Sequence, residues 1–300
     1  MIPFVREFDF AYGRTDPVSP LIQRLVAHNP GPFTFTGTGV YVVGRTEPGA
    51  RVAVIDPGPL DPAHEAALLA AVKGRTVSHV LVTHTHRDHA PLARPFAEKT
   101  GAVVLAARPP IRETHASGAL DEEEDPDFAP DIVLTGGEMI AGDGWTLETV
   151  ATPGHASNHL AFALKEENAL FSGDHVMGWS TTVVAPPDGS MRDYLASLEA
   201  VVARDFATVW PTHGPPITEV APFLAAYRAH RLEREAQVLA RLAAGDRTIA
   251  EMVPILYAAV DRRLWPAASL SVLAHLIKLV EDGVVEAAPD AGLSAEFRLI

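Results

Sequence analysis

The chain has 300 residues, 47% hydrophobic and 21% charged, which is typical of a packed globular protein with one large domain and a small appendage. It contains no cysteine, so disulfides and thiolate metal sites are excluded, and a metal would have to be bound by histidine nitrogen and carboxylate oxygen. The net charge of −14 disfavours non-specific nucleic-acid binding, and small substrates are expected instead.

The first residues, MIPFVREFDFAYG, lack the basic head, apolar run and cleavage site of a signal peptide. No segment approaches 18 uninterrupted apolar residues. We therefore expect a cytoplasmic protein that does not associate with membranes.

Turn and cap residues define the first predicted elements. Residues 37–58 hold two β-branched runs on either side of TEPGA, which predicts a hairpin that turns at Pro48–Gly49. A helix follows, with Asp61 as N-cap, Pro62 in its first turn and Gly74 as its stop.

Strands and helices then alternate. Residues 77–84 predict a buried strand, 88–101 a helix that ends at Gly101, and 102–107 another strand. This order predicts an α/β layered domain. The acidic run DEEEDPD within 108–130 has no periodicity and is expected to be a mobile surface loop.

The second half repeats the strand-rich pattern and contains one clear helix, at 190–205. The predicted strand regions are 131–140, 145–154, 159–174 and 207–214.

The C-terminal part is helical. A long helix is predicted over 221–246, a second helix over 248–260, and a helix followed by a short strand over 269–288, an order that resembles a winged helix. Lys278 is the only cation of the candidate recognition helix, so DNA binding is not expected, and packing, a substrate-rim role or homodimer formation is favoured. The predicted domains are 1–221 and 222–300.

A histidine-rich stretch, THTHRDHA, follows the strand predicted to end near residue 84. Residues two apart in an extended chain point to the same side, so His84 and His86 can aim two imidazoles at one point. Asp88 and His89 follow where the chain turns. These groups could hold one or two divalent metals if distant residues complete the ligand set.

Three further stretches supply such ligands. His155 in TPGHASNH, Asp174 in LFSGDH and His213 in VWPTHG each follow an apolar strand, and the first two come directly after a glycine. An α/β scaffold presents side chains to a site in this way, at one edge of its sheets.

The order HxHxDH, GH, GD and HG resembles the metallo-β-lactamase superfamily over roughly residues 20–220. The resemblance implies an αββα sandwich with a dinuclear site, in which a hydroxide shared by the metals is the nucleophile. It assigns seven ligands: His84, His86 and His155 to one metal, Asp88, His89 and His213 to the other, and Asp174 as the bridge.

Other residues are expected to assist. Asp88, Asp56 and His159 are the candidates for a catalytic role. Asp56 matches a carboxylate that orients ligand histidines in the family, and its alternative role is to cap a turn. His159 could be a proton donor that faces the substrate or a supporting group behind the ligands. His175 is a weaker candidate. Four histidines are expected to be structural or on the surface: His28, His64, His79 and His115.

A narrower resemblance covers nearly the whole chain. The stretches NPGPFTFTGTGVYVVG, TPGHASNH, FSGDHVMGWSTTVV and PTHGPPI resemble the β-lactamase-like protein 2 family, whose animal members are described as single-strand endoribonucleases. True zinc β-lactamases commonly have a cysteine where this chain has Asp174, and glyoxalase II type thioesterases carry a glutathione-binding segment that this chain lacks.

The expected function is therefore a dinuclear metal-dependent hydrolase that acts on a small ester, thioester or lactam-like substrate. Two divalent ions are expected, with zinc favoured over iron or manganese. The alternatives are a single-strand endoribonuclease, a glyoxalase II type thioesterase and a non-catalytic metal-binding module. An RNA substrate would require a basic or aromatic groove, whereas a narrow apolar pocket would favour the small molecule.

Overall fold

The computed structural model describes residues 2–110 and 128–300. The acidic run DEEEDPD, for which a mobile loop was predicted, and His115 lie outside the described residues.

A seven-stranded sheet is built from the first half of the chain, in the order β1 to β7. Neighbouring strands from β1 to β4 pair antiparallel, and those from β4 to β7 pair parallel. The elements of this half are β1 (Asp16–Pro17), β2 (Ile22–Val26), β3 (Gly39–Val43), β4 (Arg51–Ile55), α1 (Pro62–Ala71), β5 (Thr76–Leu81), α2 (Ala93–Thr100), β6 (Val103–Ala106) and β7 (Ile132–Val133).

A five-stranded sheet follows, in the order β12-β11-β10-β9-β8. Strands β8 to β11 pair antiparallel, while β12 pairs parallel to β11 after the crossover helix α3. The elements are β8 (Met139–Gly142), β9 (Trp145–Ala151), β10 (Leu160–Leu164), the 3-10 turn η1 (Lys165–Glu167), β11 (Ala169–Gly173), α3 (Met191–Val202) and β12 (Thr208–Pro211).

The two sheets pack face to face between helices, which confirms the predicted αββα sandwich. Alternation along β3 shows the layering: Tyr41 and Val43 enter the core between the sheets, whereas Val40 and Val42 face the core that contains Leu68 of α1. Helix α3 covers the outer face of the second sheet.

The C-terminal domain has the winged-helix order that the sequence predicted, with a second wing strand that was not predicted. Its elements are α4 (Val220–Ala243), α5 (Ile249–Leu256), the 3-10 turn η2 (Arg262–Leu264), α6 (Trp265–Glu281), β13 (Val285–Ala288) and β14 (Glu296–Leu299).

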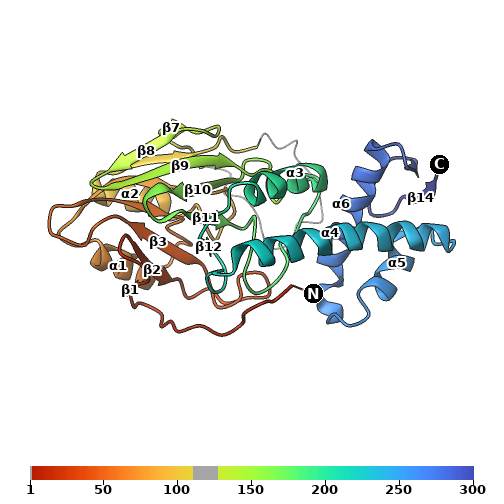
Figure 1. The fold of residues 1–300 in the computed structure, drawn as a ribbon, viewed down its shortest axis with the longest axis horizontal. Coiled ribbons are helices and arrows are strands. Elements are labelled where there is room, and N and C mark those ends of the chain that lie inside the picture. The colour runs from red at the N-terminus through yellow and green to blue at the C-terminus, as the bar shows by residue number, and fades with distance from the viewer. Residues whose placement is uncertain (1, 111–127) are drawn as a thin grey trace.

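Helix α4 joins the two domains (Figure 1). Phe223 and Tyr227 from its first half are buried in the core on the outer face of the second sheet. Val238 and Leu242 from its second half are buried in the C-terminal core. The predicted boundary at 221/222 falls at the first residues of this helix, and the two cores meet partway along it.

One stretch in the described part of the chain, Arg262–Glu281, is long and apolar enough to cross a membrane by length and composition alone. Half of it is buried inside the protein, and Val272 and Leu276 of α6 are fully buried in the C-terminal core. Its apolar character is accounted for by this packing.

Local signals predicted the start of α1 and the end of α2, whereas α1 ends at Ala71, before the predicted stop at Gly74. Asp61 caps α1 by accepting a hydrogen bond from the His64 backbone N–H, and Gly101 ends α2 with a left-handed φ of 76°. Helix α2 begins at Ala93, later than the predicted residue 88, because the backbone N–H groups of His89 and Ala90 both bond the carbonyl of His86 in a tight turn.

Candidate metal centre

The predicted ligands gather where strands end at one edge of the sandwich. Strands β9, β11 and β12 run in the same direction, so the loops that follow them leave the second sheet on one side. The loop after β5 carries four ligands and the other loops carry one each: His84, His86, Asp88 and His89, then His155, Asp174 and His213.

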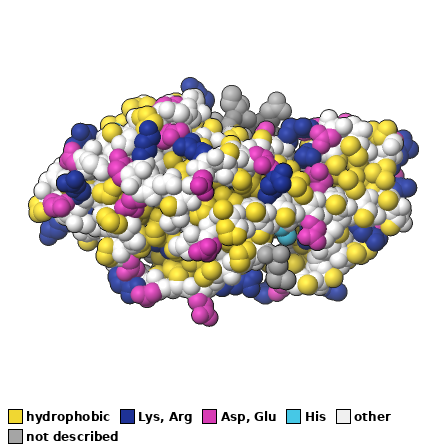
Figure 2. Space-filling model, viewed as in Figure 1, with side chains coloured by type: hydrophobic (Ala, Val, Ile, Leu, Met, Phe, Trp, Pro, Cys, Tyr) yellow, Lys and Arg dark blue, Asp and Glu magenta, His cyan; other side chains and the backbone are white. Residues whose placement is uncertain are grey.

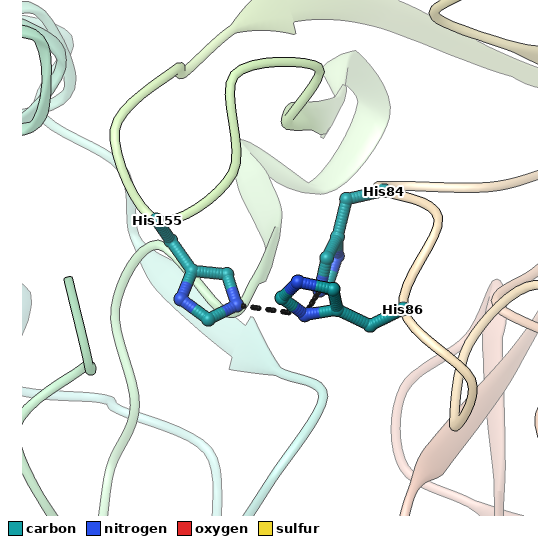
Figure 3. A group of neighbouring side chains, drawn as sticks. All are labelled: His84, His86 and His155. Atoms are coloured by element: carbon teal, nitrogen blue, oxygen red, sulfur yellow. Dashed lines mark hydrogen bonds between the residues drawn. The ribbon is translucent and has the colours of Figure 1, made fainter. Parts of the chain in front are cut away.

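Three imidazoles form the first group (Figure 3). His86 Nδ1 lies 2.8 Å from His84 Nε2 and 3.2 Å from His155 Nε2. All three side chains are buried, and their rings point toward one another. The set is the one that the resemblance assigned to the first metal.

Asp88, His89 and His213 form the second group. Asp88 Oδ2 lies 3.2 Å from His89 Nε2 and 3.1 Å from His213 Nε2. Both imidazoles are buried, while Asp88 is partly exposed. This set matches the one expected for the second metal.

Asp174 lies between the two groups. Its Oδ2 is 3.8 Å from His155 Nε2 and 3.4 Å from His213 Nε2, and its Oδ1 is 3.7 Å from His89 Nε2. One carboxylate therefore adjoins ligands of both groups, as a bridging position requires.

Hydrogen bonds on the outer ring nitrogens leave the inner ones free to bind a cation. His155 Nδ1 lies 2.7 Å from the carbonyl oxygen of Val183, and His213 Nδ1 lies 3.2 Å from that of Gly37. A carbonyl only accepts, so each Nδ1 carries a proton and each Nε2 is the ring nitrogen that faces the centre.

The buried acceptors fit metal ions. His89 Nε2 and Asp174 Oδ1 are buried without a hydrogen-bond partner, and the inward nitrogens of His84, His86 and His155 face one another. Clustered lone pairs repel unless a cation lies among them, and a set of imidazole and carboxylate donors suits zinc, iron or manganese.

The two groups differ in their electrostatics. Burial, reinforced by His155, lowers the pKa of His86 to about 3. Burial also lowers the pKa of His213, but Asp174 and Asp88 outweigh it and raise that pKa to about 10. Burial likewise lowers the pKa of His84 well below its usual value, so His84 and His86 are neutral at pH 7, whereas the second group has a carboxylate-rich environment.

Asp56 orients a ligand from outside the cluster. Its Oδ2 accepts from His89 Nδ1 at 2.9 Å, and it also accepts from the backbone N–H and hydroxyl of Thr83 and the hydroxyl of Thr212. Its φ of 47° places it in a left-handed turn after β4. These side-chain hydrogen bonds reach other segments of the chain, so of the two roles predicted for Asp56 the geometry favours the orienting one over turn capping.

His159 has both ring nitrogens engaged. Nε2 accepts from the backbone N–H of Asp174 at 3.1 Å, and Nδ1 lies 2.8 Å from the hydroxyl of Thr152. The side chain is 1% exposed. Of the two predicted roles, this geometry favours the supporting one, in which His159 holds the backbone at Asp174. His175 is buried and lies beside the ring of Tyr194, outside the cluster.

Three threonines near the ligands were missed by sequence reasoning. Thr83 and Thr212 bond Asp56, and Thr38 donates to Asp88 Oδ2 at 3.0 Å. The dipeptide Thr-His, at 83–84 and 212–213, could have indicated Thr83 and Thr212, whereas Thr38 has no such signal.

A narrow hollow of about 20 Å³ adjoins the cluster. His155 and Asp174 contribute to its lining, together with the polar Ser180. The remaining lining residues are apolar: Pro32, Phe33, Met177, Trp179 and Val183. Trp179 is held in place by stacking on Phe35, with ring centroids 4.7 Å apart.

Comparisons with known proteins agree with the fold. The family described as Metallo-beta-lactamase superfamily matches residues 34–213, and the Beta-lactamase associated winged helix domain matches 248–292. The Beta-lactamase-like protein 2 homolog of Caenorhabditis elegans is 31% identical, over 90% of this chain and 88% of its own length. Thioesterase pkgB of Emericella nidulans is 32% identical, over 81% of this chain and 63% of its own length.

Solved structures show the same fold over nearly the whole chain. A Beta-lactamase domain protein from Burkholderia ambifaria has a TM-score of 0.77 and 22% identity, with 100% of this chain and 97% of that chain covered. A metallo-beta-lactamase family protein from Thermus thermophilus has a TM-score of 0.74 and 24% identity, with 95% and 100% covered. The chain belongs to the metallo-β-lactamase superfamily and carries its associated winged-helix domain, as the sequence motifs predicted.

Proposed function

We propose that this protein is a dinuclear metal-dependent hydrolase, with zinc as the expected metal. The observation that carries the proposal is the convergence of seven imidazole and carboxylate side chains, among which His89 Nε2 and Asp174 Oδ1 are buried without a hydrogen-bond partner. Divalent ions held there would lower the pKa of a bound water to about 7 and supply a hydroxide nucleophile, as the family resemblance implies.

The chain's own residues would hold and orient this centre. His84, His86 and His155 would bind one ion, and Asp88, His89 and His213 the other, with Asp174 shared between them. Asp56 fixes the ring of His89, and His159 fixes the backbone of Asp174. Such supporting hydrogen bonds set ligand orientation and metal affinity.

The expected substrate is a small ester or thioester. The lining of the hollow beside His155 and Asp174 is mainly apolar, which favours an acyl chain over a charged group next to the metals. Its volume of about 20 Å³ is close to that of one water, so side chains of the lining must move apart to admit an acyl group. Relatives named as thioesterases, among them Thioesterase pkgB and the Atrochrysone carboxyl ACP thioesterase AgnL7 of Paecilomyces divaricatus, support this choice.

Single-stranded RNA is less well supported. Among the described residues that line the hollow there is no lysine or arginine, whereas an RNA track needs cationic side chains. On the face shown in Figure 2, basic side chains are scattered among acidic ones and do not form a basic stripe.

Metal content and its dependence on the ligands test the hydrolase proposal. Purified protein should contain about two equivalents of metal, and the double variant His84→Ala/His86→Ala should lose metal and hydrolysis together. Sub-stoichiometric metal, or hydrolysis that survives in the double variant, would sink the proposal.

A paired substrate assay tests the substrate class. The metal-loaded protein should hydrolyse short acyl thioesters and leave a fluorogenic single-stranded RNA intact. RNA cleavage that is lost in the His84→Ala/His86→Ala variant would favour the endoribonuclease, preference for the glutathione thioester would favour a glyoxalase II type enzyme, and bound metal without hydrolysis would favour a binding module.

A further inference from the structure

A buried arginine on α4 contacts the sandwich domain without a carboxylate partner. The Arg231 side chain is 4% exposed, and its Nη2 donates to the carbonyl oxygen of Thr182. Its guanidinium carbon lies 4.8 Å from the ring centroid of Tyr194 and 5.8 Å from that of Tyr227. No ion pair to Arg231 occurs between residues that the structure describes, so the carbonyl and the two rings offset its desolvation.

Helix α4 holds the neighbouring chain segment, residues 180–183, through a second side chain. The Tyr227 hydroxyl accepts from the Thr182 backbone N–H at 2.6 Å and lies 3.1 Å from the carbonyl oxygen of Ser180. Both Tyr227 and Thr182 are fully or almost fully buried. The backbone of the 180–183 segment is therefore fixed by two side chains that lie one helical turn apart on α4.

The same segment supports two metal-ligand candidates. The Thr182 hydroxyl donates to the carbonyl oxygen of Asp174 at 2.8 Å. The carbonyl oxygen of the next residue, Val183, accepts from His155 Nδ1 at 2.7 Å. A shift of the 180–183 segment would consequently move Asp174 and turn the ring of His155.

We propose that Arg231 is a positioning residue of the metal centre. By holding the Thr182 carbonyl, it fixes the segment that orients His155 and Asp174, and it thereby makes metal affinity depend on the middle of α4. The inference rests on the proposed metal-binding function but concerns a residue outside the family's ligand set.

The test is the metal affinity of full-length variants, measured by competition with a chromogenic zinc chelator. Arg231→Met should weaken zinc binding about tenfold or more, the range typical of lost supporting hydrogen bonds. Arg231→Lys, which keeps one donor but not the planar fork, should recover part of the loss. The matched control is Arg228→Met, because Arg228 lies on the same helix but is exposed and pairs with Glu199.

A second readout separates positioning from general stability. In cobalt-substituted protein, Arg231→Met should change the visible absorption of the metal, since ligand geometry would change. Tyr227→Phe removes only a hydroxyl from the same network and should weaken zinc binding in the same direction. If Arg231→Met does not fold, Tyr227→Phe alone decides the question.

The outcomes distinguish this inference from the hydrolase proposal. Zinc affinity and cobalt spectrum that stay at wild-type values in Arg231→Met and Tyr227→Phe would overturn the positioning role, even if both variants melt at lower temperature. A wild-type protein that binds no zinc would instead overturn the metal-centre proposal itself.

Discussion

The carboxylate of Asp56 lies 2.9 Å from Nδ1 of His89, although 33 residues separate the two in sequence. This contact fixes the His89 ring with Nε2 directed at Asp88 and Asp174. A side chain at the end of β4 thus determines how a ligand in the loop after β5 is presented.

Replacement of Asp56 by asparagine should weaken metal binding by about 10- to 100-fold. Asparagine tolerates the left-handed φ of this position, so the backbone is retained, but its amide nitrogen cannot accept from His89 or Thr83. Zinc affinity measured by chelator competition checks this. Asp143→Asn, on the exposed turn before β9, is the control, and equal affinities of the two variants would contradict the prediction.

Metal binding should release protons, and one should come from His213. Burial lowers its pKa, but Asp174 and Asp88 outweigh burial and raise it to about 10. Below that pH the imidazolium must lose its proton before Nε2 can bind a metal, so zinc affinity should rise with pH by up to about tenfold per unit for each proton released. Calorimetry at pH 7.5 in buffers of different ionisation enthalpy counts these protons. The His213→Asn variant should release fewer, and an unchanged number would refute the assignment.

Gly154 should tolerate no side chain, because its φ is 134° and an added Cβ would lie 2.3 Å from the Cα of Tyr194. Gly154→Ala should lower the free energy of unfolding by at least about 3 kcal/mol and weaken metal binding through the adjacent His155. Gly49→Ala is the control, because it introduces backbone strain without a steric clash. The φ of Gly49 is 81°, and no atom lies within 4 Å of an added Cβ. Gly49→Ala should cost about 1 to 2 kcal/mol in urea denaturation and leave metal binding unchanged; equal effects would contradict the packing argument.

Trp179 should limit the size of the acyl group. It lines the hollow beside His155 and Asp174 and is held by its stack on Phe35. In Trp179→Leu, the ratio of kcat/KM for a bulky acyl thioester to kcat/KM for an acetyl thioester should rise by about tenfold. A change of this size is within the discrimination that apolar pockets achieve. Metal content should remain at the wild-type value. An unchanged ratio of the two kcat/KM values would place the acyl group elsewhere.

Local sequence signals predicted the elements whose ends depend on nearby residues. The hairpin at Pro48–Gly49, the cap at Asp61 and the stop at Gly101 all follow from short-range chemistry. Strand β2 was missed because Gln23 and Arg24 interrupt its apolar pattern. Arg24 is buried there, where it donates to the carbonyl of Gly214, 190 residues away, and lies over the ring of Phe8.

The candidate site was predictable to the extent that it is encoded in side-chain identity. His155, Asp174 and His213 each follow a strand end, and parallel strand ends meet at one edge of a sheet. The supporting contacts of Val183, Gly37 and Thr182 include backbone carbonyls, which every residue type supplies. Such contacts leave no mark in the sequence, so the role inferred for Arg231 required the structure.

Helix α4 also bears on how the protein unfolds. Its first half is buried with the second sheet and its second half with α6, and no loop interrupts it between the two cores. If either core unfolded, the half of α4 that packs in it would lose its contacts and expose its apolar face. The helix would then unwind from that end toward the domain that is still folded, whose core also contains α4. The sandwich and the winged helix should therefore melt as one cooperative unit.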